Sequence, residues 1–286
     1  MHDSDTNETS VITHLNDELL AEHPPAEAER FAIERGGFEV EAWLLHPPGF
    51  DPSKKYPVVL DIHGGPSGSY GPAMLPWQQV LATNGFLVII ANPRGSTTYG
   101  RTFAQQVFGA WGTEDYADLM AVVDKVLERP YADAERTGIW GYSYGGFMTS
   151  WIIGQTQRFR ACVCGAPVFD MVSMYGTSDM GVFGADLHWG GKPHEARAVM
   201  LAHSPATFAH RATTPTLIIQ GEADERCPVG QAEQMFIELK QAGCEVEFAR
   251  YPGGGHMFLI AGPPQHKIDM YQRSLDWMKE HLGEPV

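Results

Sequence analysis

The sequence has few cysteines and no long apolar run. Four cysteines occur in 286 residues, too few to cross-link a chain of this length, and no C-x-x-C pair indicates a zinc site. No stretch approaches the ~20 apolar residues of a membrane-spanning helix, and the acidic N-terminus lacks the apolar core of a signal peptide. We therefore expect buried free thiols, no bound metal and a cytoplasmic location. The cysteines are Cys162, Cys164, Cys227 and Cys244.

Positive charge is also scarce. Lys and Arg number 20 against 35 Asp and Glu, which gives a net charge of −15. Such a balance repels phosphate backbones and anionic lipid surfaces, so we expect neither a nucleic-acid nor a membrane partner. The apolar content of 43% suits a chain that buries a large core without a metal or disulfide. The oligomeric state stays open, a homo-oligomer included.

The chain divides into a polar start and a patterned remainder. Residues 1–29 are acidic and contain two adjacent prolines, which predicts a tail or linker, and residues 30–286 predict one catalytic domain. Gly36-Gly37 separates two strand-like runs and predicts a hairpin. Short apolar runs that alternate with helical patterns predict an α/β fold, with a mostly parallel central sheet covered by helices on both faces. The predicted strands are 57–63, 86–92, 137–142, 161–166, 215–221 and 245–251, and the predicted helices are 75–85, 115–129, 229–243 and 266–283.

One connection is unusually long. Residues 167–213 hold Met, Tyr, Trp, Gly and His with no clean period, and an insert of this length predicts a lid or binding loop. Tyr175, Phe183 and Trp189 are candidates for lining a substrate pocket, with burial in a core as the alternative. The insert's histidines have spacings that fit no standard metal site. They are His188, His194 and His203.

The segment Gly141-Tyr142-Ser143-Tyr144-Gly145 follows a strand-like run and opens a helix-like one. This is the G-x-S-x-G pattern of a nucleophile elbow, in which the serine sits in a strained turn at the carboxyl edge of a sheet. Glycine on either side lets the tight turn pack against its neighbours. The pattern predicts Ser143 as a nucleophile.

A nucleophilic serine needs a base, and the base needs an acid that orients it. In this fold the chain order is serine, acid, histidine. Asp224 follows the predicted strand 215–221, and His256 follows three glycines after strand 245–251. Spacing alone favours Asp224 as the acid but leaves Glu222 and Glu225 as alternatives.

Two backbone N–H groups are needed to stabilise the oxyanion. One is expected from Tyr144, directly after the nucleophile, and the other from Gly65 in the His63-Gly64-Gly65-Pro66 loop, for which a plain turn is the alternative reading. No G-x-G-x-x-G or P-loop motif is present, so we expect no nucleotide and no cofactor.

Several motifs together resemble the prolyl oligopeptidase family of serine peptidases, in particular its acylaminoacyl-peptidase branch. The resemblance covers about residues 30–286. It implies an α/β-hydrolase fold, Ser143 as nucleophile, Asp224 as acid, His256 as base, and Gly65 with Tyr144 as the oxyanion hole. The motifs are HGGP at 63–66, NPRGSTTYG at 92–100, WGYSYGGFMTSW at 140–151, YGTSD at 175–179, GEADERCP at 221–228 and PGGGH at 252–256.

The sequence departs from this family in two ways. Family members usually carry an N-terminal β-propeller that restricts access to the site, and this chain has none. Its residues 12–22 resemble the segment that follows the last propeller blade, so we expect either an excised catalytic domain or a naturally short relative. We therefore expect an open site that hydrolyses esters faster than amides. The stretch at 164–171, CGAPVFDM, is also less polar than the family pattern.

The sequence therefore predicts a serine hydrolase that cleaves short or N-acylated peptides through an acyl-enzyme. A carboxylesterase acting on small acyl esters would use the same residues, and a non-catalytic binding module is the alternative from a different class. Arg94 is expected to support the loops around the site, with a substrate contact as the alternative. Cys227 is expected to pack beneath the loop that carries the acid.

Overall fold

The structure is a computed structural model that describes residues 2–71 and 75–284. Its centre is an eight-stranded sheet with strand order β10-β9-β8-β7-β5-β6-β4-β3. The hairpin β3–β4 and the pair β4–β6 are antiparallel, and the other neighbours are parallel. The strands are β3 (Glu27–Arg35), β4 (Phe38–His46), β5 (Tyr56–Ile62), β6 (Leu87–Ala91), β7 (Ala132–Tyr142), β8 (Ala161–Gly165), β9 (Thr216–Gly221) and β10 (Val246–Tyr251).

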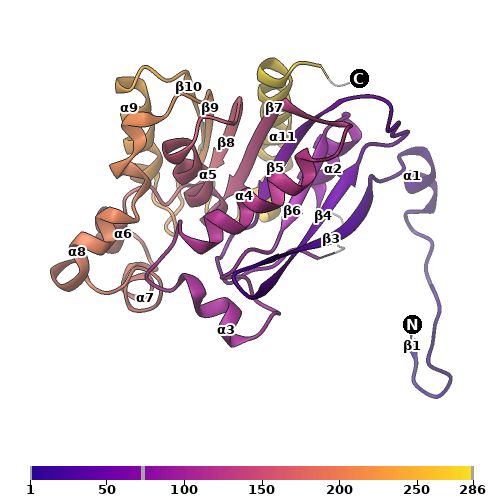
Figure 1. Cartoon of the computed structure of the whole chain (residues 1–286), viewed down its shortest axis with the longest axis horizontal. Coiled ribbons are helices and arrows are strands. Elements are labelled where there is room, and N and C mark those ends of the chain that lie inside the picture. The colour runs from indigo at the N-terminus through magenta and orange to yellow at the C-terminus, as the bar shows by residue number, and fades with distance from the viewer. Residues whose placement is uncertain (1, 72–74, 285–286) are drawn as a thin grey trace.

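Helices cover both faces of this sheet (Figure 1). Side chains alternate between faces along a strand, and β7 shows the two layers. A Cβ added at Gly138 would meet Met278 and Leu282 of α11, whereas one added at Gly141 would meet Gly145 of α5. The longer helices outside the insert are α2 (Pro76–Thr83), α4 (Glu114–Leu127), α5 (Tyr144–Gln155), α9 (Val229–Gln241) and α11 (Pro264–Leu282), and the short ones are α3 (Arg101–Ala104) and α10 (Phe258–Ala261).

The central strands are apolar along their whole length because both of their faces are covered. Every residue of β5, β6, β8 and β9 is buried. Gly36 and Gly37 both have positive φ, at 60° and 78°, as a two-residue hairpin turn requires. The predicted fold class is therefore confirmed, and the strands and helices lie close to their predicted positions.

The first residues lie apart from this body. A two-stranded ribbon, β1 (His2–Asp3) with β2 (Glu8–Thr9), and the helix α1 (Asp17–Glu22) are exposed throughout, and Figure 1 shows them extending away from the sheet. The first strand of the sheet begins at Glu27, inside the stretch predicted as a tail, because Glu27 pairs with His46 of β4. The predicted boundary at residue 30 thus falls within β3.

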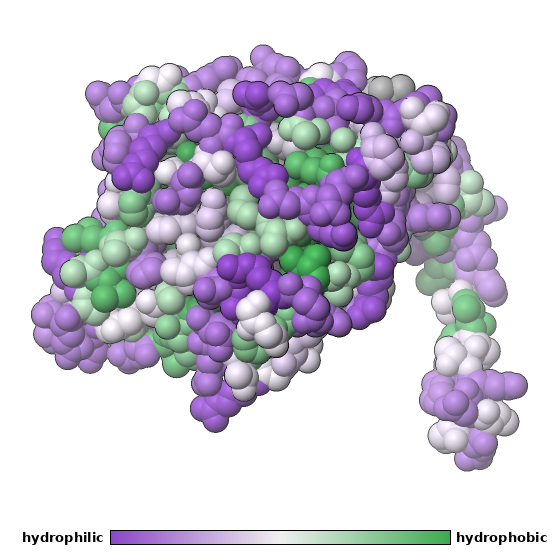
Figure 2. Space-filling model, in the orientation of Figure 1, coloured by the Kyte–Doolittle hydropathy of each residue, from purple (hydrophilic) through white to green (hydrophobic). Residues whose placement is uncertain are grey.

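The insert is helical. Residues 167–213 form α6 (Met171–Thr177), α7 (Gly181–Leu187), α8 (Pro193–Ala202) and two short 3₁₀ turns, η2 (Pro205–Thr207) and η3 (Ala209–Arg211). These elements are too short to show a helical period in the sequence, which explains why no helix was predicted there. Figure 2 shows apolar side chains gathered on the surface over α6 and α8. Among the described residues, no helix combines the length and the apolar character needed to cross a bilayer.

Candidate active site

Ser143 lies in the turn between β7 and α5. Its backbone has φ 63° and ψ −118°, a left-handed conformation that is strained for a residue with a side chain. The turn is held in place by close packing: a Cβ added at Gly145 would lie 2.1 Å from the carbonyl oxygen of Ile62. The structure therefore has the strained elbow that the G-x-S-x-G pattern predicts, with Ser143 directly before the first residue of α5.

Two loops bring the acid and the histidine together at the same edge of the sheet. The loop after β9 carries Asp224, and the loop after the neighbouring strand β10 carries His256. The backbone N–H of Ala223 donates to the carbonyl oxygen of Gly254 at 2.9 Å, which joins the loops. Gly221 and Gly254 touch backbone to backbone, because a Cβ on Gly221 would lie 2.2 Å from the Gly254 oxygen.

The three side chains form one chain of hydrogen bonds. His256 Nε2 lies 2.9 Å from Ser143 Oγ, and His256 Nδ1 lies 2.8 Å from Asp224 Oδ2. The other carboxylate oxygen of Asp224 accepts the backbone N–H groups of Arg226 and Cys227, at 2.9 and 2.8 Å. Asp224 is buried, so these donors replace the water that an ionised carboxylate would otherwise bind.

The neighbouring acids are directed elsewhere. The side chain of Glu222 accepts a hydrogen bond from Arg250 at 2.9 Å, and the side chain of Glu225 is exposed. Of the three candidate acids in this loop, Asp224 is therefore the one hydrogen-bonded to His256. Gln220, which the sequence analysis did not consider, donates to Asp224 at 3.4 Å and to the Cys227 carbonyl at 2.9 Å.

Cys227 packs beneath the acid loop, as predicted. Its side chain is buried beside Asp224 and lines the same cavity as Ser143. Burial, together with the charge of Asp224, raises the pKa of the Cys227 thiol well above its usual range. The thiol therefore stays neutral and is a poor nucleophile.

The expected oxyanion donors lie beside Ser143. Tyr144 is the first residue of α5, so its N–H has no partner within the helix. Gly65 lines the same cavity as Ser143 and Tyr144. It has φ 134°, and a Cβ there would lie 2.5 Å from the backbone nitrogen of Ser67, so the loop needs glycine at this position.

Buried side chains hold the loops around these donors. Burial lowers the pKa of His63, and the neutral ring donates from Nδ1 to the Gly64 oxygen at 2.8 Å while Nε2 accepts from Ser96 Oγ at 2.9 Å. Arg94 donates to the carboxylate of Asp118 in α4 at 2.7 and 2.9 Å. Arg94 thus supports a loop, as predicted, and does not line the cavity beside Ser143.

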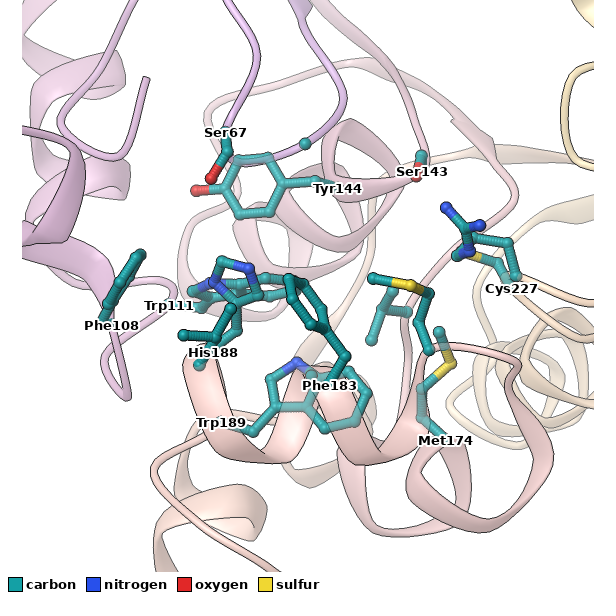
Figure 3. Close-up of a pocket in the computed structure, with 16 residues that line it drawn as sticks. Ser67, Phe108, Trp111, Ser143, Tyr144, Met174, Phe183, His188, Trp189 and Cys227 are labelled. Atoms are coloured by element: carbon teal, nitrogen blue, oxygen red, sulfur yellow. The ribbon is translucent and has the colours of Figure 1, made fainter. Parts of the chain in front are cut away.

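A cavity of about 280 Å³ opens between Ser143 and the helical insert, and we call it the insert cavity. Figure 3 shows Ser143 and Tyr144 on one side of this cavity and a group of rings on the other side. The rings include Trp111, Phe183 and Trp189. The lining is mostly apolar or aromatic. Its members include Phe108, Trp111, Tyr144, Val168, Met174, Met180, Phe183, Leu187, His188 and Trp189.

Two of the three predicted pocket residues line this cavity and one does not. Phe183 and Trp189 contribute to the lining. Tyr175 is absent from it and packs against the hydrophobic core, because consecutive helix residues point about 100° apart and its neighbour Met174 takes the cavity position. Trp111, whose ring lies 4.9 Å from that of Tyr144, was missed because it comes from a loop distant in sequence.

Comparison with known proteins identifies the family. The sequence profile of the prolyl oligopeptidase family matches residues 74–285. The chain belongs to the prolyl oligopeptidase family. The acylaminoacyl peptidase of Pyrococcus horikoshii has a closely similar structure, with a TM-score of 0.91 and 30% identity over 96% of this chain and 44% of that one. The predicted resemblance, including its acylaminoacyl-peptidase branch, is confirmed.

Curated relatives are longer than this chain. It is 39% identical to the peptidase YuxL of Bacillus subtilis over 96% of its own length and 42% of the relative's. It is 31% identical to the human acylamino-acid-releasing enzyme over 91% of its length and 36% of the relative's. The chain therefore spans less than half the length of these relatives.

Proposed function

We propose that this chain is a serine peptidase that hydrolyses short or N-acylated peptides through an acyl-enzyme. The observation that carries the proposal is the hydrogen-bond chain from Ser143 through His256 to Asp224, at 2.9 and 2.8 Å. Family membership supports it, because relatives of this chain include the human acylamino-acid-releasing enzyme and a dipeptidyl-peptidase 5 of Schizosaccharomyces pombe.

The geometry supports a two-step acyl transfer. Ser143 Oγ attacks the substrate carbonyl while His256 Nε2 takes the hydroxyl proton, and Asp224 holds the imidazole with Nδ1–H toward itself. The N–H groups of Gly65 and Tyr144 stabilise the negative charge that develops on the carbonyl oxygen. His256 then returns the proton to the leaving group, and water hydrolyses the acyl-enzyme by the same steps.

The insert cavity suits an apolar substrate side chain on the acyl side of the scissile bond. Its lining is aromatic and sulfur-containing, and it opens directly beside Ser143. A solved acylaminoacyl peptidase at 30% identity is in complex with Z-Gly-Gly-Phe-chloromethyl ketone. A phenylalanine side chain has the chemistry that this cavity would bind.

Covalent labelling tests the proposal. A fluorophosphonate probe should label the parent and the Ser67→Ala variant, since Ser67 is a second serine of the same cavity, but not Ser143→Ala. Esters and amides share this mechanism, so kcat/KM should be compared for N-acetyl-phenylalanine p-nitroanilide and the matching p-nitrophenyl ester. Labelling that persists in Ser143→Ala would refute the nucleophile, and turnover of the ester alone would favour a carboxylesterase.

We further propose the cytoplasm as the compartment in which the chain works. All four cysteines are buried and unpaired, as is usual in a reducing compartment. Fractionation of cells that express the native protein would test this, and recovery outside the cytoplasmic fraction would contradict it.

A further inference from the structure

A second cavity touches Ser143 from the other face of the sheet. It has a volume of about 270 Å³ and shares with the insert cavity only Ser143. We call it the tryptophan cavity, because Trp77 of α2 and Trp140 of β7 line it together with Tyr142 and the residues after His256. Trp140 lies on the α11 face of β7, since its Nε1 donates to Ser274 of α11 at 3.4 Å.

The walls of the tryptophan cavity are apolar and held in place. The indole rings of Trp77 and Trp140 stack with centroids 5.6 Å apart and an interplanar angle of 19°. Trp77 Nε1 donates to Asp61 at 3.0 Å, so both indole N–H groups are already used within the protein. At the rim, the residues Met257 and Ile260 are 51% and 56% exposed. Such exposed apolar side chains at a cavity mouth suit an apolar ligand.

The tryptophan cavity lies on the side of His256. Met257 follows His256 directly, and Tyr142 OH donates to the His256 carbonyl at 2.9 Å. The rings of Tyr142 and His256 lie 5.5 Å apart. The insert cavity, by contrast, is lined by the expected oxyanion donors Gly65 and Tyr144.

This placement separates the two halves of a substrate. When the acyl-enzyme forms, the Ser143 Oγ–carbon bond forms and the carbon–nitrogen bond breaks, and the Ser143 proton passes through His256 Nε2 to the departing nitrogen. The departing group must therefore lie within reach of His256, on the side of the tryptophan cavity. The acyl group then lies on the side of the insert cavity.

We infer that the tryptophan cavity binds the leaving group and selects apolar or aromatic residues on the amine side of the scissile bond. The inference rests on the acyl transfer proposed above. None of the described residues that line the cavity is Asp, Glu, Lys or Arg, and both ring nitrogens of its histidine, His63, are engaged with Gly64 and Ser96. A leaving group with a charged side chain would find no oppositely charged partner among these lining residues.

Trapping of the acyl-enzyme by added amines tests the inference. An amine that attacks the acyl-enzyme occupies the leaving-group site, because this reaction reverses acylation. The acyl-enzyme is made from the p-nitrophenyl ester of N-acetyl-phenylalanine, and glycinamide, leucinamide or aspartic acid α-amide competes with water. The amounts of dipeptide amide and free acid are measured by chromatography. Leucinamide should trap about tenfold more than glycinamide at equal concentration, and the aspartic amide less than glycinamide.

Two matched variants place the selectivity at this cavity. Ile260→Lys puts a cation at the rim. The ratio of trapping by leucinamide to trapping by glycinamide should therefore fall toward one, and trapping by the aspartic amide should rise. Ile268→Lys makes the same change at a residue of α11 that is 67% exposed and lines neither cavity, and it should keep the parent's preferences.

The possible results separate the inference from the function on which it rests. Equal trapping by leucinamide and glycinamide, trapping by none of the amines, or equal effects of the two lysine variants would overturn the inference, while fluorophosphonate labelling of Ser143 would leave the proposed function standing. Absence of both labelling and p-nitrophenol release would overturn the proposed function and the inference with it.

Discussion

At the scale of single residues, Asp224 decides which nitrogen of His256 carries the proton. Its carboxylate accepts from Nδ1, which leaves Nε2 free to accept the proton of Ser143. The backbone donors of Arg226 and Cys227 fix the carboxylate in turn. The role that we propose for Asp224 is therefore orientation of His256, and a substitution that keeps its shape tests that role.

The Asp224→Asn variant should lose on the order of 10⁴ in kcat while remaining folded, because an amide donates to Nδ1 and leaves the proton on Nε2. Glu225→Gln serves as the matched control and should stay within about twofold of the parent, since that side chain is exposed. Steady-state kinetics and unfolding temperatures check both. An Asp224→Asn enzyme within tenfold of the parent would move the acid role to another residue.

Asp61, behind the tryptophan cavity, gives the protein a pH-dependent stability. It is fully buried and accepts hydrogen bonds from Gln78 and Trp77. Burial raises the pKa of Asp61 from 3.8 to about 6, and these hydrogen bonds offset only part of that rise. The folded state therefore holds this proton more tightly than the unfolded chain, so the contribution of Asp61 to stability falls as the pH rises through about 4 to 6.

The Asp61→Asn variant should remove that dependence. Between pH 5 and pH 8 the unfolding free energy of the parent should fall by about 1 kcal/mol relative to that of the variant. Any change in stability that the substitution causes equally at both pH values cancels in this comparison. Urea unfolding of both proteins at the two pH values measures the difference. A parent and variant with parallel pH profiles would show that Asp61 does not carry the predicted proton.

At the scale of elements, the elbow depends on how closely α5 approaches the sheet. Gly145 and Gly146 press against the carbonyl oxygens of Ile62 and Gly165, where added Cβ atoms would lie at 2.1 and 2.2 Å. Backbone atoms cannot move aside as a flexible side chain can. The position of Ser143 at the sheet edge therefore depends on glycine at these helix positions.

The Gly145→Ala variant should be destabilised by about 3 kcal/mol or more, or fail to accumulate as folded protein, because α5 would have to move away from β5. Gly176→Ala, in α6, is the control: a Cβ there has nothing within 4 Å, so stability should be unchanged or rise slightly. Denaturant unfolding and soluble yield report the outcome. Equal stability of the two variants would contradict the packing argument.

At the scale of the whole molecule, the sheet ends in an edge that one strand protects. β3 pairs along its full length with β4, and much of β4 is buried. Residues 2–23 make little contact with this body, since α1, the β1–β2 ribbon and the residues between them are exposed. The two regions should therefore respond very differently to removal.

Removal of residues 1–23 should leave the unfolding temperature and the labelling of Ser143 unchanged. Removal of residues 1–35 also deletes β3, which exposes apolar side chains and the unpaired edge of β4, and should cause aggregation. Thermal unfolding and size-exclusion chromatography compare the two truncations. A lower unfolding temperature after removal of residues 1–23 would show that these N-terminal residues contribute to the fold.

The sequence by itself determined the sheet, the elbow and the family. Apolar runs and helical periods are local, so they predict strands and helices without knowledge of the packing. The G-x-S-x-G pattern predicts a strained serine for the same reason, and Ser143 has that conformation. The chain order of acid and histidine after the elbow placed Asp224 and His256 on loops at the correct edge of the sheet.

Only the tertiary structure decided which side chains meet. Residue spacing left Glu222 and Glu225 as alternatives to Asp224 for the acid. The contact between Asp224 and His256 depends on a backbone hydrogen bond between two loops that lie about 30 residues apart in the sequence. The lining of both cavities likewise joins distant segments, such as the stacked Trp77 and Trp140. Spacing along a chain encodes the local backbone and its buried face, whereas contacts between elements depend on how those faces pack in three dimensions.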